Sequence, residues 1–276
     1  MTMRTGARPW WLWLNILSLD APLVALVWQE GFARSLDVEL GWASRVILAL
    51  CTWLAYSGDR ILDAHRLKGP VVSARHEFAR VHRRPLSLLW SGGLLIALAL
   101  AWQLPRPELF GGLALLLVVA AYFALHHHPA TRRPAGRFKE VMAGTVFALG
   151  SVYAVIVTAG ISPGLLLLSA AWAGLCSANC LVLASWDREQ DRVMEQPSLA
   201  REWPAIESVI PWVVGLSLLA AAAGAWWDPR WHVLMVAVAA SGAGLLLLLG
   251  LGRGLRSSLR HVLADAVLLT PVCFLV

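Results

Sequence analysis

The chain has 276 residues, of which 58% are hydrophobic and 14% are charged, and this composition excludes an ordinary soluble globular domain. Its apolar residues occur in runs of about 20, the length at which a helix crosses a hydrocarbon core of about 30 Å. The net charge of +6 does not indicate nucleic-acid binding, because the basic residues lie mostly in loops beside these runs. In that position we expect them to orient a membrane protein and to contact anionic lipid or substrate phosphates.

Nine apolar runs follow one another along the chain. In order, they cover residues 10–30, 42–62, 86–104, 107–126, 139–160, 163–186, 207–226, 231–251 and 260–276. Each is long and lacks the alternation of a barrel strand, so we expect transmembrane helices. The first run follows Arg4 and Arg8 but extends past Leu26 with no small-residue cleavage site, which predicts an uncleaved span rather than a signal peptide. The sequence thus predicts an all-α membrane protein with nine transmembrane helices in a single polytopic domain, residues 1–276.

The distribution of lysine and arginine predicts the orientation of the chain. With the N-terminus in the cytoplasm, 19 of the 23 Lys and Arg residues lie on the cytoplasmic side. The three longer loops, 63–85, 127–138 and 187–206, are then all cytoplasmic. The first loop mixes basic residues with Phe78 and Val81, which predicts a short amphipathic helix on the membrane or over a cavity. We expect an integral protein of the bacterial inner (cytoplasmic) membrane whose functional site faces the cytoplasm.

Two short acidic segments repeat the pattern D-R-x-x-D. Residues 59–63 end the second apolar run, and residues 187–191 end the sixth. Aspartates four positions apart share one helix face, and the negative pole at the end of a helix disfavours them. One such pair is more often a solvated loop end, but two pairs in matching places, each followed by an Arg-rich loop, indicate a missing cation. Mg²⁺, held by carboxylates together with substrate phosphates, is the cation that we expect.

On these motifs the chain resembles the UbiA superfamily of intramembrane prenyltransferases, which has nine helices and two Asp-rich motifs at the cytoplasmic ends of helices two and six. Residues 56–63 are similar to the second half of its N-D-x-x-D-x-x-x-D motif, and residues 187–191 are similar to its later D-x-x-x-D. Residues 197–200 resemble the segment that follows the later motif. Four residues resemble the family's basic loop between helices four and five: Pro129, Arg132, Arg137 and Lys139.

The resemblance implies a UbiA-prenyltransferase-like bundle that transfers a prenyl group from a prenyl diphosphate to an aromatic or lipid acceptor with Mg²⁺. The catalytic residues, which are also the expected metal ligands, are Asp59, Asp63, Asp187 and Asp191. The residues expected to bind substrate are Arg60, Arg188, Arg132, Lys139, Asn179 and Tyr56. The expected partners are prenyl diphosphate, membrane lipid and a hydrophobic acceptor whose identity the sequence leaves open. No nucleic acid is expected.

The chain also departs from the family pattern. Ala55 and Tyr56 stand where the first motif usually has Asn-Asp, and Asn179 and Leu183 stand where a tyrosine and a lysine often precede the second motif. The alternative is therefore a non-catalytic membrane protein of the UbiA fold with a structural, partner-binding or transport role. A CDP-alcohol phosphotransferase is disfavoured, because the continuous D-G, A-R and G-x-x-x-D-x-x-x-D stretch of that family is absent. Convergence of the four aspartates beneath a cavity would favour the enzyme.

Three charged residues lie within apolar runs: Asp20, Arg45 and Asp265. Intramembrane charges usually face the protein interior or pair with one another. These residues either form a proton or acceptor site or lock helices together, with Asp20 and Arg45 the favoured pair. The tract of residues 126–128, three histidines, predicts a polar interfacial collar rather than a zinc site, because adjacent helical histidines point in different directions; one ring could still contact a phosphate.

Overall fold

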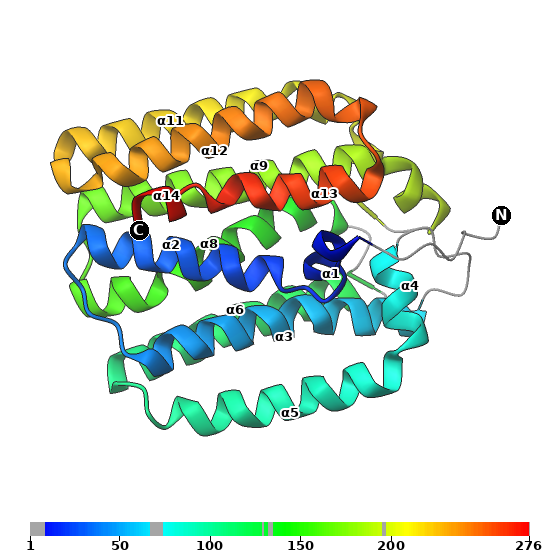
Figure 1. Ribbon diagram of the computed structural model, residues 1–276, viewed down its shortest axis with the longest axis horizontal. Helices are drawn as coiled ribbons and strands as arrows, with labels where there is room; N and C mark the ends of the chain where they lie inside the picture. Colours follow the sequence, from blue (N-terminus) through cyan, green and yellow to red (C-terminus); the bar gives the residue numbers. More distant parts are fainter. Residues whose placement is uncertain (1–8, 67–73, 129, 132–134, 195–196, 276) are drawn as a thin grey trace.

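The computed structural model describes residues 9–66, 74–128, 130–131, 135–194 and 197–275. Every regular element within these ranges is a helix, and the long helices lie side by side along one direction (Figure 1). The long helices are α2 (Asp20–Ser35), α3 (Trp42–Arg66), α5 (Arg83–Ala101), α6 (Arg106–His127), α8 (Lys139–Ala159), α9 (Pro163–Val193), α11 (Ile210–Trp227) and α12 (His232–Leu251). The shorter elements are α1 (Trp10–Ile16), α4 (Ala74–Val81), α10 (Leu199–Glu202), η1 (Pro204–Ser208), η2 (Pro229–Trp231), η3 (Gly252–Gly254), α13 (Ser257–Ala266), η4 (Val267–Leu269) and α14 (Val272–Leu275). The predicted all-α architecture is confirmed.

The described residues contain fewer candidate membrane spans than the nine that were predicted. Among the described residues, seven helical segments are long and apolar enough to cross a membrane, and α1 with α2 would add an eighth as one broken span. Helix α3 is 25 residues long but is not one of these segments, because charged residues near both of its ends lower its hydropathy. A count of nine spans therefore stays a prediction.

The first apolar run was predicted as one span over residues 10–30, and the structure divides it into two helices. Helix α1 ends at Ile16, α2 begins at Asp20, and the two helices make an angle of 81°. Ser18 lies between them with a φ of 58°, in the left-handed region, which cannot continue a right-handed helix. The break leaves the last carbonyl groups of α1 without helical partners and places Asp20 in the first turn of α2.

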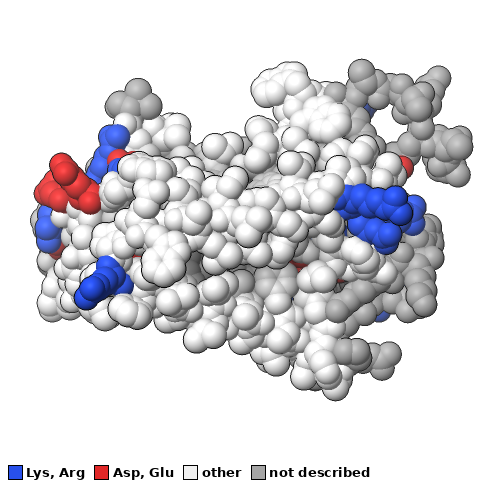
Figure 2. Space-filling model, turned by 90° about the horizontal axis from the view of Figure 1, so that it is seen from below, with Lys and Arg blue, Asp and Glu red and all other residues white. Residues whose placement is uncertain are grey.

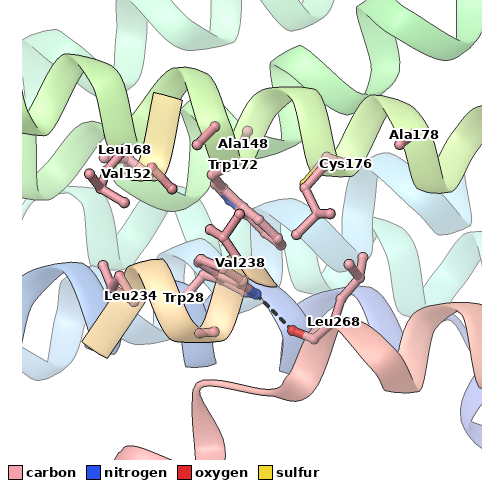
Figure 3. Packing of buried hydrophobic residues seen from close by; sticks show 14 of the residues in the cluster. Trp28, Ala148, Val152, Leu168, Trp172, Cys176, Ala178, Leu234, Val238 and Leu268 are labelled. Carbon is pink, nitrogen blue, oxygen red and sulfur yellow. Dashed lines mark hydrogen bonds between the residues drawn. The ribbon is translucent and has the colours of Figure 1, made fainter. Parts of the chain in front are cut away.

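The core of the bundle is built around α9, which packs closely against α8 and α11. Trp28 of α2 and Trp172 of α9 stack with their ring centroids 3.8 Å apart, and the Trp28 indole donates a 2.7 Å hydrogen bond to the carbonyl of Leu268 (Figure 3). At Gly144 of α8, an added Cβ would lie 2.4 Å from the backbone nitrogen of Ser177. Glycine is therefore required at this contact for α8 and α9 to approach so closely.

The surface has an apolar middle and charged ends. On the face shown in Figure 2, lysine, arginine and the acidic residues gather toward the two ends, and the broad middle is almost free of charge. Leu88 of α5 and Leu117 of α6 are 75% and 72% exposed. A continuous apolar surface of this kind is unfavourable in water. It is the surface of an integral membrane protein.

One end of the bundle collects the elements that carry the acidic motifs, and we call it the acidic end. Helices α3 and α9 end there, α13 begins there, and α4 lies across it (Figure 1). Helix α4 confirms the short helix that was predicted within residues 63–85. It buries His76 and Ala79 and exposes Arg80 and Val81, so it is amphipathic.

Candidate functional site

The two acidic motifs lie together at the acidic end, where α4 contacts an aspartate of each. Asp59 and Asp63 lie in the last turns of α3, and Asp187 and Asp191 lie in the last turns of α9. Because the two aspartates of each motif are four positions apart, they lie on one face of their helix. Lys139, the first residue of α8, interacts electrostatically with Asp59, Asp63 and Asp191. The structure thus brings carboxylates of both motifs to a single cation.

Asp59 is paired with a histidine from α6. The distance from His127 Nε2 to Asp59 Oδ1 is 3.1 Å, and the His127 ring stacks on Phe123 one turn earlier. The tract of residues 126–128 was predicted as an interfacial collar, but His127 points inward to the first acidic motif. The prediction missed this contact because the sequence does not show which neighbouring helix a histidine at the end of α6 will face.

Asp63 and Asp187, one from each motif, are both reached from α4. His76 Nε2 lies 3.6 Å from Asp63 Oδ2, and the neighbouring Arg75 lies 3.4 Å from Asp187 Oδ2 through a guanidinium nitrogen. Burial lowers the pKa of His76, although the hydrogen bond with Asp63 opposes the shift. The sequence contains one indication that Arg75 and His76 could reach the site, namely the short helix predicted within the loop 63–85.

A third histidine completes the contacts of the second motif. His261 of α13 lies 2.8 Å from Asp187 Oδ2 through Nε2, and its Nδ1 lies 2.6 Å from the carbonyl of Ser257. The other oxygen of Asp187, Oδ1, is buried and has no hydrogen-bond partner among the described residues. His261 is 74 positions from Asp187, and nothing in the sequence indicated this contact.

The two arginines within the motifs turn away from the carboxylates. Arg60 is buried and donates hydrogen bonds of 2.6 and 3.0 Å to the carbonyls of Asn15 and Ile16, at the end of α1. Arg188 donates a 3.0 Å hydrogen bond to the carbonyl of Pro204. The physical reason is helix geometry, since the residue after an aspartate is rotated by about 100° around the helix axis. No ion pair between either arginine and a motif carboxylate is present in the described part of the chain.

The predicted basic loop is represented by two described residues. Lys139 lies among the aspartates, whereas Arg137 pairs with Glu202 at 2.6 Å, on the exposed surface. Arg132, predicted to bind substrate, lies outside the described residues. Of the two described cations, Lys139 is thus the one that interacts with motif aspartates.

Tyr56 and Asn179 lie deeper in the bundle than the motifs and line a small cavity of about 20 Å³. Tyr56 makes an edge contact with Phe147 at a centroid distance of 6.1 Å. Asn179 donates a 3.2 Å hydrogen bond from Nδ2 to Asp265 Oδ1. Asn179, which was predicted to bind substrate, is thus hydrogen-bonded to α13. The residues that line the cavity are Ala21, Val24, Tyr56, Gly144, Phe147, Cys176, Asn179, Cys180, Asp265 and Leu268.

The predicted pair of Asp20 and Arg45 is wrong. Arg45 instead forms a 2.9 Å ion pair with Glu30, and Asp20 accepts a 2.7 Å hydrogen bond from Asn15. The break after α1 explains the difference, because it places Asp20 in the first turn of α2. Glu30 lies ten residues further along the same helix, about 15 Å away, at the end of the bundle where the first turn of α3 carries Arg45.

The motif carboxylates have the donor chemistry of a magnesium site. Mg²⁺ binds oxygen ligands and is commonly held by one or two protein carboxylates together with substrate phosphates and water. Asp187 fits this role, since its buried Oδ1 has no partner among the described residues. Within the described part of the chain, no three His, Cys, Asp or Glu side chains are arranged to hold a metal ion by themselves. A metal ion at these carboxylates would therefore need further ligands, such as the oxygens of a phosphate.

Comparison with known proteins identifies the fold. No protein-family model matches the sequence, and no curated protein matches it. Among solved structures, the chain is similar to one described as the apo structure of a UbiA homolog from Aeropyrum pernix K1, with a TM-score of 0.66 and 15% sequence identity. The match covers 94% of this chain and 98% of that one. The predicted UbiA-like fold is therefore confirmed over nearly the whole chain, and at this identity the likeness speaks for the fold alone.

Proposed function

We propose that this chain, which shares its fold with a UbiA homolog, is an integral membrane prenyltransferase of the UbiA superfamily. It would transfer a prenyl group from a prenyl diphosphate to a hydrophobic aromatic or lipid acceptor with Mg²⁺. The observation that supports the proposal is that α4 reaches both acidic motifs at one end of the bundle, with His76 3.6 Å from Asp63 and Arg75 3.4 Å from Asp187. In the proposed orientation, with the N-terminus inside a bacterial cytoplasmic membrane, this end faces the cytoplasm.

Each group at the acidic end has a part in diphosphate binding. Asp59, Asp63, Asp187 and Asp191 would hold Mg²⁺, which when bound neutralises these carboxylates and the charge on the departing diphosphate. Lys139 is positioned to bind the non-bridging oxygens of the diphosphate through charge-assisted hydrogen bonds.

Arg75 is a second cation that can bind the diphosphate, since it already lies 3.4 Å from Asp187. The prenyl chain would extend from the acidic end into the apolar interior. Tyr56, three residues before the first motif aspartate, offers an aromatic face to the allylic cation.

Binding of a labelled prenyl diphosphate tests the proposal. In detergent with Mg²⁺, the wild-type protein should bind radiolabelled farnesyl diphosphate, and the double variant Asp59→Ala, Asp187→Ala should bind it at least about tenfold more weakly, since each lost charged contact contributes about 1.5–3 kcal/mol. Glu189→Ala is the matched control, because Glu189 lies between the aspartates of α9 but is exposed and pairs with Arg192. Undiminished binding by the double variant would refute the proposed role of the motifs.

A non-catalytic protein of the same fold is the second candidate. Two observations favour it: three of the four motif aspartates contact a histidine, and Ala55, Tyr56 and Leu183 replace residues of the family pattern. A folded wild-type protein that binds no farnesyl diphosphate at any Mg²⁺ concentration would support this candidate. Tight binding of farnesyl diphosphate with no prenylated product from a panel of acceptors would indicate a protein that binds prenyl diphosphate but does not transfer it.

A further inference from the structure

The corner between α4 and α5 carries a group of arginines that none of the roles above uses. Arg80 lies in the last turn of α4, and Arg83 and Arg84 are the first two residues of α5. All three residues are exposed, and we call them the corner arginines. On the face shown in Figure 2, basic side chains gather at the end where α4 lies in Figure 1, and the middle of the face is apolar.

Two of the corner arginines lack a counter-charge in the described part of the chain. Arg83 and Arg84 form no hydrogen bond and no ion pair with a described residue, and the first turn of α5 contains no acidic residue. By contrast, the exposed Arg137 pairs with Glu202 at 2.6 Å. Adjacent positive charges repel one another, and the positive pole of α5 lies at the same place. The corner therefore favours the approach of an anion.

An exposed apolar surface begins next to the corner arginines. Leu88 follows Arg84 by four positions and Leu95 follows Leu88 by seven, so the three residues share one face of α5. Leu88 is 75% exposed and Leu95 is 67% exposed, on a helix that is long and apolar enough to cross a membrane. Arg84 precedes Leu88 by about 6 Å along the helix axis. A cation at this distance from lipid-facing leucines lies at the depth of the lipid headgroups.

We propose that the corner arginines bind the headgroup of an anionic phospholipid, whose acyl chains lie along Leu88 and Leu95. The lipid phosphate accepts charge-assisted hydrogen bonds from guanidinium groups, which can bind two phosphate oxygens at once. A zwitterionic lipid has the same phosphate but adds a cation that the arginines repel, and a free phosphate lacks the apolar contact. The combination of clustered cations and an exposed apolar face therefore fits an anionic lipid.

The bound lipid would also hold α4 in place. Helix α4 has eight residues, too few to be stable alone in water. Arg75 and His76, near its beginning, reach the two acidic motifs, and Arg80 lies near its end. Two residues separate Arg80 from Arg83, so one phosphate can bind α4 and α5 together. We therefore expect the lipid to stabilise α4 across the acidic end, and this inference does not depend on the proposed transferase activity.

Lipid binding to the purified protein tests the inference. Because each arginine near an anionic lipid contributes about fivefold to binding, the wild type in detergent should bind dioleoylphosphatidylglycerol at least about tenfold more tightly than dioleoylphosphatidylcholine, which has the same acyl chains. The double variant Arg83→Gln, Arg84→Gln should lose at least about tenfold in affinity for the anionic lipid. Native mass spectrometry measures both. At equal ionic strength, inorganic phosphate should displace this lipid no better than chloride does.

Arg106→Gln is the matched control for the single variant Arg84→Gln. Both arginines are exposed, lie in the first turn of a membrane helix and precede an exposed apolar residue by four positions, Phe110 in the case of Arg106. The first turn of α6, however, contains the acidic Glu108 and no second arginine. Arg84→Gln should weaken binding of the anionic lipid about fivefold, and Arg106→Gln should leave it unchanged.

Hydrogen exchange of the wild type tests the effect on α4 and needs no variant. At a phosphatidylglycerol concentration about ten times the dissociation constant, amide exchange in residues 74–81 should slow about tenfold, because the lipid must leave before α4 opens. Exchange in the first turn of α12, at the other end of the bundle, should not change. The inference is overturned if the two lipids bind equally, if Arg84→Gln behaves like Arg106→Gln, if the double variant keeps its affinity, if inorganic phosphate displaces the lipid better than chloride, or if exchange in α4 is unchanged.

Discussion

Lys139 interacts electrostatically with aspartates of both acidic motifs, namely Asp59, Asp63 and Asp191. We expect Lys139→Gln to weaken farnesyl diphosphate binding at least about tenfold, because a hydrogen bond with a charged group contributes about 1.5–3 kcal/mol. Equilibrium binding in detergent measures the effect. Arg253→Gln is the control, because Arg253 is an exposed cation that pairs with Glu207. Unchanged affinity of Lys139→Gln would exclude a phosphate contact at this lysine.

His76 predicts a dependence of stability on pH. Burial lowers the pKa of His76 in the folded protein below its unfolded value of about 6.5. The unfolded chain therefore binds more protons, and the stability contributed by neutral His76 is complete above about pH 6.5 and declines as the pH falls below it. Thermal unfolding in detergent with EDTA should show a smaller loss between pH 7.5 and pH 5.5 for His76→Gln than for the wild type. Equal losses in both proteins would contradict the assignment.

Helix α4 joins the two motifs across the acidic end. Its adjacent residues Arg75 and His76 reach Asp187 of α9 and Asp63 of α3, and Phe78 packs edge-on against Trp13 of α1 at 5.9 Å. The eight residues of α4 thus contact three other elements, α1, α3 and α9. The arrangement explains why a helix so short, which would be marginal alone in water, is formed here.

Helices α8 and α9 pack so closely that we expect no room for an added methyl group at their contact. At Gly144, a Cβ would lie 2.4 Å from the backbone nitrogen of Ser177, so the two helices must separate. Gly144→Ala should destabilise the protein by about 1–3 kcal/mol, the usual cost of overpacking. The matched control is Gly215→Ala in α11, where nothing lies within 4 Å and alanine should be neutral or stabilising. Thermal unfolding in detergent that ranks the two variants equally would contradict this account.

The orientation of the whole bundle can be tested by labelling. In a cysteine-free background, Glu189→Cys marks the acidic end, and Asp228→Cys marks the turn between α11 and α12 at the other end. The excess of Lys and Arg on one side predicts that a membrane-impermeant maleimide labels Asp228→Cys on intact spheroplasts and Glu189→Cys on inside-out vesicles. The opposite pattern would reverse the topology and place the acidic end outside the cytoplasm.

The amino-acid sequence by itself determined the properties that depend on local pattern. Apolar runs of membrane-spanning length predicted an all-helical membrane protein, and the two D-R-x-x-D segments predicted paired carboxylates at two helix ends. The resemblance built on those segments predicted the bundle that the structural comparison bears out. These inferences succeeded because helix formation and the spacing of residues on one helix face depend on near neighbours in the chain.

The tertiary structure alone decided which side chains meet. The histidines that contact Asp59 and Asp187 are 68 and 74 positions away, and Asn179 donates a hydrogen bond to Asp265, 86 positions away. The break at Ser18 depends on the same packing, since the buried Arg60 binds the carbonyls that the break releases. Such contacts depend on which helices pack against one another. The sequence pattern of one helix does not show which other helix will lie beside it.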